Sequence, residues 1–300
     1  MASVKERIIS LKEQRNALIL AHNYCLPEVQ DIADHVGDSL GLSIIASEAD
    51  ADVIVFCGVT FMAESAKVLA PKKKVLMPEP FAMCPMASMC SAEQIRDAKN
   101  CYKDACVIGY VNTTASAKAE MDICCTSSNA VAVVSSVPQK DVIFVPDMNL
   151  GAYTASKAPN KNVILWNGYC PVHQAITLQN INDLRTKHPD ALVLAHPECR
   201  PEVLAAADEI GSTERMIMFS KATDSKELIV ATEIGMRHRL EKECPDKKFY
   251  FIDHALCSVM KMTDLSSILR ALENMSPEVI LDRDTMERAE GPLRKMIGVK

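Results

Sequence analysis

Three segments of this chain repeat one another, and this repetition constrains the fold more than any other feature. Residues 20–39 align without a gap on residues 194–213 and share ten of twenty positions, where unrelated sequences share about one. A fainter copy spans residues 109–127, with Tyr110 in the place of His22 and His196. The sequence therefore predicts three homologous units.

Within each unit, short β-branched runs alternate with helical patterns. This alternation is typical of β-α-β units with parallel sheets, so each unit is expected to be a small α/β sandwich. The predicted strands are residues 17–21, 53–57 and 75–77 in the first unit, 107–111, 142–145 and 163–165 in the second, and 192–195, 228–231 and 249–251 in the third.

Cysteine segments, and not flexible linkers, mark the ends of the units. Cys84, Cys170 and Cys257 each follow the last predicted strand of a repeat, and no glycine-rich stretch separates the units. We therefore expect closely packed units at residues 1–86, 87–172 and 173–263. The tail 264–300 predicts two helices, one broken by Pro277, that return to the first unit beside the N-terminal helix.

The overall composition excludes several functional classes. A net charge of −6, a pI near 5.7 and the lack of a long basic stripe argue against a nucleic acid or an anionic membrane as partner. The N-terminal residues mix apolar and charged side chains at helical spacing, which fits neither a signal peptide nor a membrane span. We expect a cytoplasmic protein, in which patterned cysteines serve metals or catalysis more often than disulfides.

The repeat singles out Cys84, Cys170 and Cys257 among twelve cysteines. Three thiolates fit zinc, with three protein ligands and water, or a 4Fe-4S cluster with one open iron. An all-thiolate set from three distant loops favours the cluster, but spacing alone leaves zinc open. The remaining cysteines are expected to be small buried hydrophobic residues, and Cys25 and Cys199 are assigned to packing despite their matching positions.

Polar side chains follow the first strand of every unit, at the edge where parallel α/β sheets place their working residues. These side chains are His22, Tyr24, Tyr110, Asn112, His196 and Glu198. His173, three residues after Cys170, is expected to join them. Acids, bases and hydrogen-bond donors of these types, directed into one cavity, are typical of an active site.

Hydroxyl-bearing turns recur after these motifs and contain Ser39, Ser127, Ser212 and Thr213. Each precedes a predicted helix, so helix capping explains part of the pattern. Helix N-termini also bind carboxylate and phosphate groups, and three of them aimed at one cavity would suit a substrate with several anionic groups.

Taken together, these segments resemble the quinolinate synthase (NadA) family over essentially the whole chain. The likeness rests on AHNYCLPEVQDIADHVGDSL, YVNTTASAKAEMDICCTSSNA, NGYCPVHQ, LAHPECRPEV with EIGST, and the segment at Cys257. It implies three α/β/α sandwich domains with parallel sheets around a pseudo-threefold axis. It also implies condensation of iminoaspartate with dihydroxyacetone phosphate to quinolinate in NAD biosynthesis, and a functional link to an enzyme that produces iminoaspartate.

The resemblance further implies residue roles. The ligands of an oxygen-sensitive 4Fe-4S cluster, whose open iron acts as a Lewis acid, would be Cys84, Cys170 and Cys257. The catalytic residues would be His22, Tyr24, Tyr110, Asn112 and Glu198. The substrate-binding residues would be Ser39, Ser127, His173, His196, Ser212 and Thr213. Some family members carry Cys-x-x-Cys-x-x-Cys at the third ligand, whereas Met260 and Thr263 stand here, so the redox-active disulfide proposed for that run is not available.

Three other functions compete with this interpretation. A different open-iron hydro-lyase would share the cluster but need no phosphate site. A zinc hydrolase would contain zinc and lack brown absorption. A repeat scaffold or iron-sulfur sensor would present an extended surface, whereas the polar motifs are predicted to point inward. For the synthase, an imine intermediate must be shielded from water, so movement of one unit against the others is expected.

Overall fold

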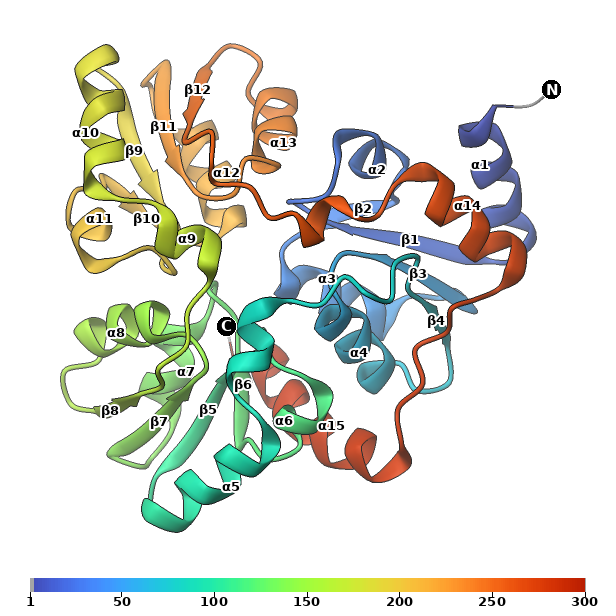
Figure 1. The fold of residues 1–300 in the computed structure, drawn as a ribbon, viewed down its shortest axis with the longest axis horizontal. Coiled ribbons are helices and arrows are strands. Elements are labelled where there is room, and N and C mark those ends of the chain that lie inside the picture. The colour runs from blue at the N-terminus through green and yellow to red at the C-terminus, as the bar shows by residue number, and fades with distance from the viewer. Residues whose placement is uncertain (1–2, 300) are drawn as a thin grey trace.

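The computed structural model describes residues 3–299, and these fold into three parallel four-stranded sheets with flanking helices. The three sheets have the same strand order, β2-β1-β3-β4, β6-β5-β7-β8 and β10-β9-β11-β12. Figure 1 shows them as three lobes around a common centre. The predicted α/β class is confirmed, while an exact pseudo-threefold axis stays a prediction.

The helices and strands follow the chain in three blocks and a tail. The first block contains α1 (Val4–Gln14), β1 (Ala17–His22), α2 (Pro27–Ile32), β2 (His35–Gly37), α3 (Ser39–Glu48), β3 (Val53–Cys57), α4 (Thr60–Leu69), β4 (Lys74–Leu76) and the 3₁₀ turn η1 (Pro85–Met89). The second contains α5 (Ala92–Cys101), β5 (Cys106–Tyr110), α6 (Ala115–Lys118), β6 (Ile123–Cys125), α7 (Ala130–Ser136), β7 (Asp141–Val145), α8 (Met148–Lys157) and β8 (Asn162–Leu165). The third contains α9 (Pro171–Ala175), α10 (Leu178–Lys187), β9 (Leu192–Ala195), α11 (Pro201–Ala205), β10 (Glu209–Ile210), α12 (Thr213–Ala222), β11 (Glu227–Ala231), α13 (Met236–Glu243), β12 (Lys248–Phe251) and η2 (Val259–Lys261). The tail contains α14 (Leu265–Asn274) and α15 (Arg283–Gly298).

A repeated aspartate makes the same pair of backbone contacts in all three units. The carboxylates of Asp34, Asp122 and Asp208 each accept the backbone N–H of a residue fifteen positions earlier, in the first strand of the unit, at 2.8 Å. Each aspartate N–H in turn donates to a carbonyl of that same strand. This pair of bonds holds the segment after α2, α6 or α11, the helix that follows the first strand of each unit, beside that strand.

The nine predicted strands are present, each with ends within one residue of the prediction, but each unit contains a fourth strand that the sequence did not predict. These strands, β2, β6 and β10, are two or three residues long. A run this short has no readable alternation of apolar and polar side chains. It is defined by pairing with the first strand of its unit.

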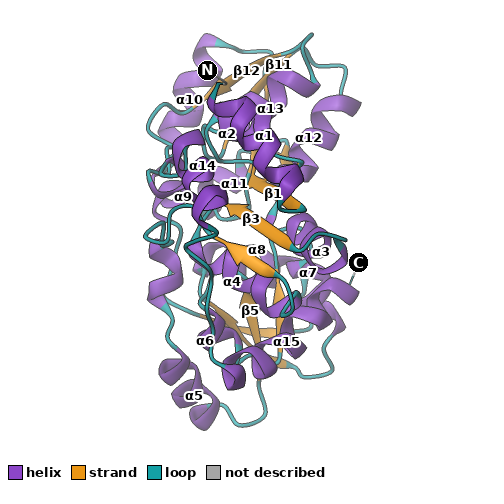
Figure 2. Cartoon of the chain, turned by 90° about the vertical axis from the view of Figure 1, so that its right-hand side faces the viewer, coloured by secondary structure: helices purple, strands orange, loops and turns teal. Residues whose placement is uncertain are grey.

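The two tail helices pack in different places, although the sequence predicts that both return to the first unit. Helix α14 lies against α1 and contacts β3 (Figure 2). Its Ile268 and Leu272 share an apolar cluster with Ile8. Helix α15 lies against β6 and α6 of the second block and against α4 of the first. Its buried side chains Leu293 and Met296 belong to the large core that spans the blocks, which accounts for this position.

Across residues 3–299, no helix combines the length and the apolar character needed to span a bilayer. Of the predicted unit boundaries, at residues 1–86, 87–172 and 173–263, the first falls inside η1, the second inside α9, and the third in the connection before α14. Residues 1, 2 and 300, which the predicted first unit and tail include, lie outside the described residues.

Candidate active site

The carboxyl ends of the strands of all three sheets surround one cavity. About 700 Å³ in and at the mouth of this cavity, open solvent included, is not filled by atoms. Its polar lining consists of His22, Tyr24, Asp38, Ser39, Tyr110, Asn112, Thr126, Ser127, His173, His196, Glu198, Thr213, Glu233 and the thiols of Cys84, Cys170 and Cys257. Apolar walls come from Val59, Phe61, Met62, Val172 and Met260. Within the described part of the chain, no lysine or arginine lines this cavity.

Of the fourteen residues that the sequence singled out for the site, all but one line this cavity. The exception is Ser212, whose Oγ accepts the N–H of Arg215 at 3.4 Å and caps α12. Its neighbour Thr213 does face the cavity. In the middle unit, Ser127 lies in the turn before α7 and is not its cap, because the N-cap position is Asn129.

Each of the three cysteines stands just before a short helical turn. Cys84 and Cys170 are the N-cap residues of η1 and α9, and in both turns a proline follows at the first position, where its missing N–H costs nothing. Cys257 precedes η2 by one further residue. Repeat equivalence thus extends to the local backbone around each thiol.

Burial dominates the titration of these thiols. It raises the pKa of Cys84 to about 12, and it raises the pKa values of Cys170 and Cys257, although backbone N–H groups of the following turns oppose the shift. The charge of Cys84 further raises the pKa of Cys170, and the charge of Cys257 raises the pKa of Cys84. The three thiols are therefore close enough to interact electrostatically. Without a bound cation, they remain protonated at neutral pH.

Two acidic residues that the sequence analysis missed hold the cysteine segments. Asp147 accepts the N–H of Cys170 at 3.3 Å, and Glu233 accepts the N–H of Cys257 at 3.0 Å. Asp147 is the second residue after β7 and Glu233 is the second residue after β11. The two residues occupy equivalent positions of the repeat, so the repeat carried a signal that could have found them. Glu233 is 1% exposed and pairs with Lys261 at 2.9 Å.

Side chains at the rim of the cavity connect all three units. Asn23 of the first unit donates to Thr213 Oγ1 of the third at 2.7 Å. Ser128 of the second donates to Asp38 of the first at 2.6 Å. His196 Nε2 of the third lies 3.2 Å from Ser127 Oγ of the second. The site is therefore complete only when the three units are docked.

The two repeat-equivalent histidines are neutral and have the same tautomer. Burial lowers the pKa values of His22 and His196 to about 3. Nδ1 of His22 accepts the N–H of Tyr24 at 3.2 Å, and Nδ1 of His196 accepts the N–H of Glu198 at 3.3 Å. Because Nδ1 is an acceptor in both rings, each Nε2 carries the proton and is a hydrogen-bond donor.

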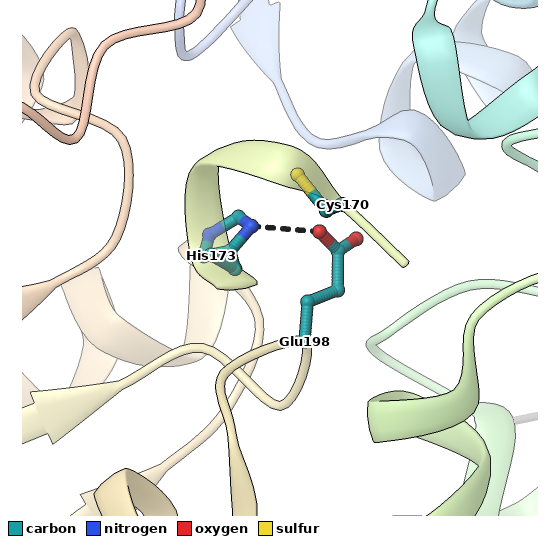
Figure 3. Close-up of side chains that lie close together, drawn as sticks. All are labelled: Cys170, His173 and Glu198. Carbon is teal, nitrogen blue, oxygen red and sulfur yellow. Dashed lines mark ion pairs between the residues drawn. The ribbon is translucent and has the colours of Figure 1, made fainter. Parts of the chain in front are cut away.

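Glu198 is the charged centre of the site. Burial alone would raise the pKa of its carboxyl, but His173, His196 and the hydroxyl of Tyr110 lower it to about 2. Tyr110 donates a short hydrogen bond to Oε1. His173 Nδ1 lies 2.7 Å from Oε2, at ion-pair distance but outside good hydrogen-bond alignment (Figure 3). His173 also stacks on His196, with ring centroids 4.6 Å apart.

Among residues 3–299, one group of three potential ligands has all its ligand atoms within 4.8 Å of one another, namely Cys170, His173 and Glu198. The three repeat-equivalent cysteines do not form such a group. Sulfur ligands of a single zinc ion, each at about 2.3 Å, would lie within about 4 Å of one another. The thiols are thus spaced more widely than one zinc ion requires, as a larger metal group would need.

The fold and cavity define a three-unit α/β enzyme whose site is assembled from all three units. The family model "Quinolinate synthetase A protein" matches residues 6–298, and the chain belongs to this family. The quinolinate synthase of Methanosarcina barkeri is 51% identical over 300 residues, covering 100% of this chain and 98% of that protein. The quinolinate synthase of Dehalococcoides mccartyi strain CBDB1 is 50% identical over 297 residues, covering 99% and 98%. The protein is an enzyme of the quinolinate synthase type.

Proposed function

We propose that this enzyme condenses iminoaspartate with dihydroxyacetone phosphate to give quinolinate, phosphate and water, with a 4Fe-4S cluster on Cys84, Cys170 and Cys257. The observation that carries the proposal is the convergence of three repeat-equivalent thiols with buried acid-base groups in one cavity. Family membership supports the product, and the chemistry of the donor set supports the cluster.

The cysteine set fits such a cluster on two counts. The donors are three soft thiols, the ligand type that iron-sulfur clusters use. Their spacing is wider than a single zinc ion needs, and they are still near enough to influence one another's pKa. When bound, a cluster with one open iron supplies a Lewis acid that eases loss of a hydroxyl group.

Neutral donors of the chain would bind the acidic groups of the substrates. Nε2–H of His22 and His196, the hydroxyls of Ser39, Ser127 and Thr213, and the N-termini of α3 and α12 face the cavity or its rim. Hydrogen bonds of this kind hold carboxylate and phosphate without a lysine or arginine. Oδ1 of Asn112 is buried without a hydrogen-bond partner, which leaves it free to accept a hydrogen bond from an N–H or O–H group of a bound substrate.

Proton transfers would fall to the remaining groups of the cavity. Dehydration needs a base for a C–H proton and an acid for the leaving hydroxyl. Glu198 is ionised, and Tyr24 and Tyr110 retain their protons because burial, with the Glu198 charge, raises their pKa values. We therefore assign the acid role to the tyrosines and the base role to the group around Glu198.

The wider setting of the enzyme follows from this chemistry. We propose a cytoplasmic enzyme of three domains, with boundaries near residues 86, 172 and 263, that receives iminoaspartate from another enzyme. The units are expected to close around the substrate, because an imine intermediate hydrolyses in water. Crystal structures with and without a product-like diacid test this, and identical angles between the domains would contradict it.

An anaerobic assay with both substrates tests the proposed reaction. Wild type should release quinolinate and phosphate and contain iron and sulfide, whereas Cys84→Ala, Cys170→Ala and Cys257→Ala should lose both the product and the brown absorption. The matched control is Cys101→Ala. The sequence predicts a buried Cys101, but this residue is exposed on α5 and should be dispensable. A cluster-containing wild type that releases neither quinolinate nor phosphate would instead indicate a different open-iron hydro-lyase, and activity in any of the three ligand variants would refute the cluster assignment.

The close group of Cys170, His173 and Glu198 favours a second candidate, a single metal ion such as zinc with mixed ligands. The two candidates differ in their dependence on His173. His173→Gln should keep its iron if the three cysteines hold a cluster, and should lose its metal if His173 is a ligand. Metal analysis of anaerobically purified protein separates them, because zinc without sulfide supports only the second.

A further inference from the structure

The hydroxyl that the middle unit directs into the cavity is held differently from its equivalents in the other two units. Ser39 and Thr213 are the first residues of α3 and α12, so the first turn of a helix fixes their positions. Ser127, their equivalent, lies in a turn three residues before the start of α7. Something other than a helix must therefore hold Ser127 at the cavity, where its Oγ lies 3.2 Å from Nε2 of His196.

Asn129 closes this turn around Ser127. It is a buried residue at the N-cap position of α7, but its side chain makes no capping bond to that helix. Its Oδ1 instead accepts the backbone N–H of Thr126 at 2.8 Å and the Thr126 hydroxyl at 3.3 Å. The same hydroxyl accepts the N–H of Ser128 at 3.2 Å. The residues on both sides of Ser127 are thus tied to Asn129.

The other half of the Asn129 amide faces the end of α15. Nδ2 donates to the carbonyl oxygens of Met296 at 3.1 Å and Val299 at 3.3 Å. Both lie at the end of the helix, where backbone carbonyls are open to outside donors. Because two donors face Oδ1 and two acceptors face Nδ2, the orientation of the amide is fixed and its hydrogen-bonding capacity is used in full. Asn129 therefore has nothing left to offer a substrate directly.

The equivalent positions of the other two units hold their turns through the backbone. The repeat places Gly41 and Arg215 opposite Asn129. The N–H of Gly41 donates to Oδ1 of the cap residue Asp38 at 2.8 Å, and the N–H of Arg215 donates to Oγ of the cap residue Ser212 at 3.4 Å. In the middle unit α7 begins too late for such a bond, and the contact with α15 stands in its place.

We propose that Asn129 is a positioning residue through which the end of α15 holds Ser127 where its hydroxyl can bind an acidic group of the substrate. The same turn extends this support to the first unit, because Ser128 donates to Asp38, the cap residue of α3, at 2.6 Å. The identity of the substrate rests on the proposed function, whereas the placement of the turn by α15 does not.

A double-mutant cycle tests whether Asn129 acts through Ser127. Asn129→Leu keeps a similar shape without charge and removes all the hydrogen bonds of the amide. With anaerobically prepared holoenzyme and quinolinate as the probe, calorimetry should give a dissociation constant about tenfold above wild type for Asn129→Leu and for Ser127→Ala, as expected for one lost hydrogen bond to a charged group. The double variant should bind like Ser127→Ala alone, because both changes act on one contact. Additive losses, or wild-type affinity in Asn129→Leu, would overturn the proposal.

Leu293→Ala is the matched control for a general loosening of α15. Leu293 is buried on α15 and does not contact the turn through a hydrogen bond, so its truncation should lower the stability of the protein through a cavity. Its affinity for quinolinate should stay near wild type. An equal loss of affinity in Leu293→Ala and Asn129→Leu would mean that any loosening of α15 disturbs the site, which would overturn the specific role of Asn129.

Hydrogen exchange tests the same link without a ligand. Deletion of residues 299 and 300 removes the Val299 carbonyl, and it should speed exchange of the backbone amides of residues 126–129, as read by mass spectrometry. The equivalent turn at residues 38–41 should exchange as in wild type. Unchanged exchange at residues 126–129 would overturn the inference. If wild type neither forms nor binds quinolinate, the proposed function fails, and this measurement still decides whether α15 holds the turn.

Discussion

Replacement of Lys118 by methionine is expected to change how the stability of the protein depends on alkaline pH. Lys118 ends α6 and is 0% exposed. Its ammonium group donates to the carbonyl of Thr113, next to Asn112, and lies 5.2 Å from the ring centroid of Phe61. Both Asn112 and Phe61 line the cavity, so this buried charge supports one wall of the site.

The magnitude follows from the pKa of the buried ammonium. Burial lowers the pKa of Lys118 from 10.5 to about 8, although Cys124, Glu64 and Cys84 oppose the shift. The unfolded chain therefore binds this proton more tightly, and the cost to folding is about 3 kcal/mol at pH 7. This cost shrinks as the pH rises through 8 toward 10.5. Between pH 7 and pH 9, the free energy of unfolding should gain about 1.3 kcal/mol from this group.

The assay is urea unfolding of wild type and Lys118→Met at pH 7 and pH 9, without oxygen and with a thiol reductant. Ionisation of the buried cysteines in the unfolded chain lowers the free energy of unfolding over the same pH range. This effect is the same in both proteins and cancels in the difference between them. Wild type should therefore improve relative to Lys118→Met by about 1.3 kcal/mol on going to pH 9. Lys157→Met, at an exposed position of α8, is the matched control and should follow wild type. Parallel pH dependence of wild type and Lys118→Met would refute the reasoning.

Three further predictions concern the site. Because burial lowers the pKa values of His22 and His196 to about 3, below pH 6.5 the unfolded chain binds a proton at each histidine that the folded chain does not bind. The free energy of unfolding should therefore fall by about 1.4 kcal/mol for each histidine at pH 5.5. His196→Gln should weaken this dependence in urea unfolding at pH 7.5 and 5.5, and equal dependence would contradict it. Glu233→Gln removes the partner of Lys261 and should cost about 3 kcal/mol of unfolding free energy, partly recovered when Lys261→Met is added; no recovery would argue against the ion pair. Gly168→Ala places a Cβ 2.4 Å from a backbone carbonyl oxygen and should cost about 1–3 kcal/mol and lower the iron content per chain, whereas wild-type iron content would show that the loop adapts freely.

The repeat made most of the cavity predictable from the sequence. His22 and His196, two of its equivalent positions, lie at matching strand ends, and parallel strands with short connections bring such ends together. This prediction required neither the separation of the repeats along the sequence nor the positions of the helices between them. Ser212 did not follow the pattern, because adjacent hydroxyls of one turn point in different directions and only Thr213 reaches the cavity.

Residues that act through long-range contacts were not predictable in this way. Asn129 and Val299 are 170 positions apart, and no local pattern connects them. The sequence did not predict the position of α15 for the same reason, because an apolar helix face does not specify which neighbour covers it. Asp147 and Glu233 could have been predicted from their equivalent positions in the repeat. A single acidic residue after a strand, however, gives no functional signal on its own.

The fusion of three similar units in one polypeptide has a consequence for how this site can vary. In a ring of three identical chains, any substitution would occur three times around the axis. Here Gly41, Asn129 and Arg215 occupy one equivalent position and are encoded separately. A single mutation therefore alters one side of the cavity and leaves the other two unchanged. The thiols can stay alike for a common task while the other walls diversify.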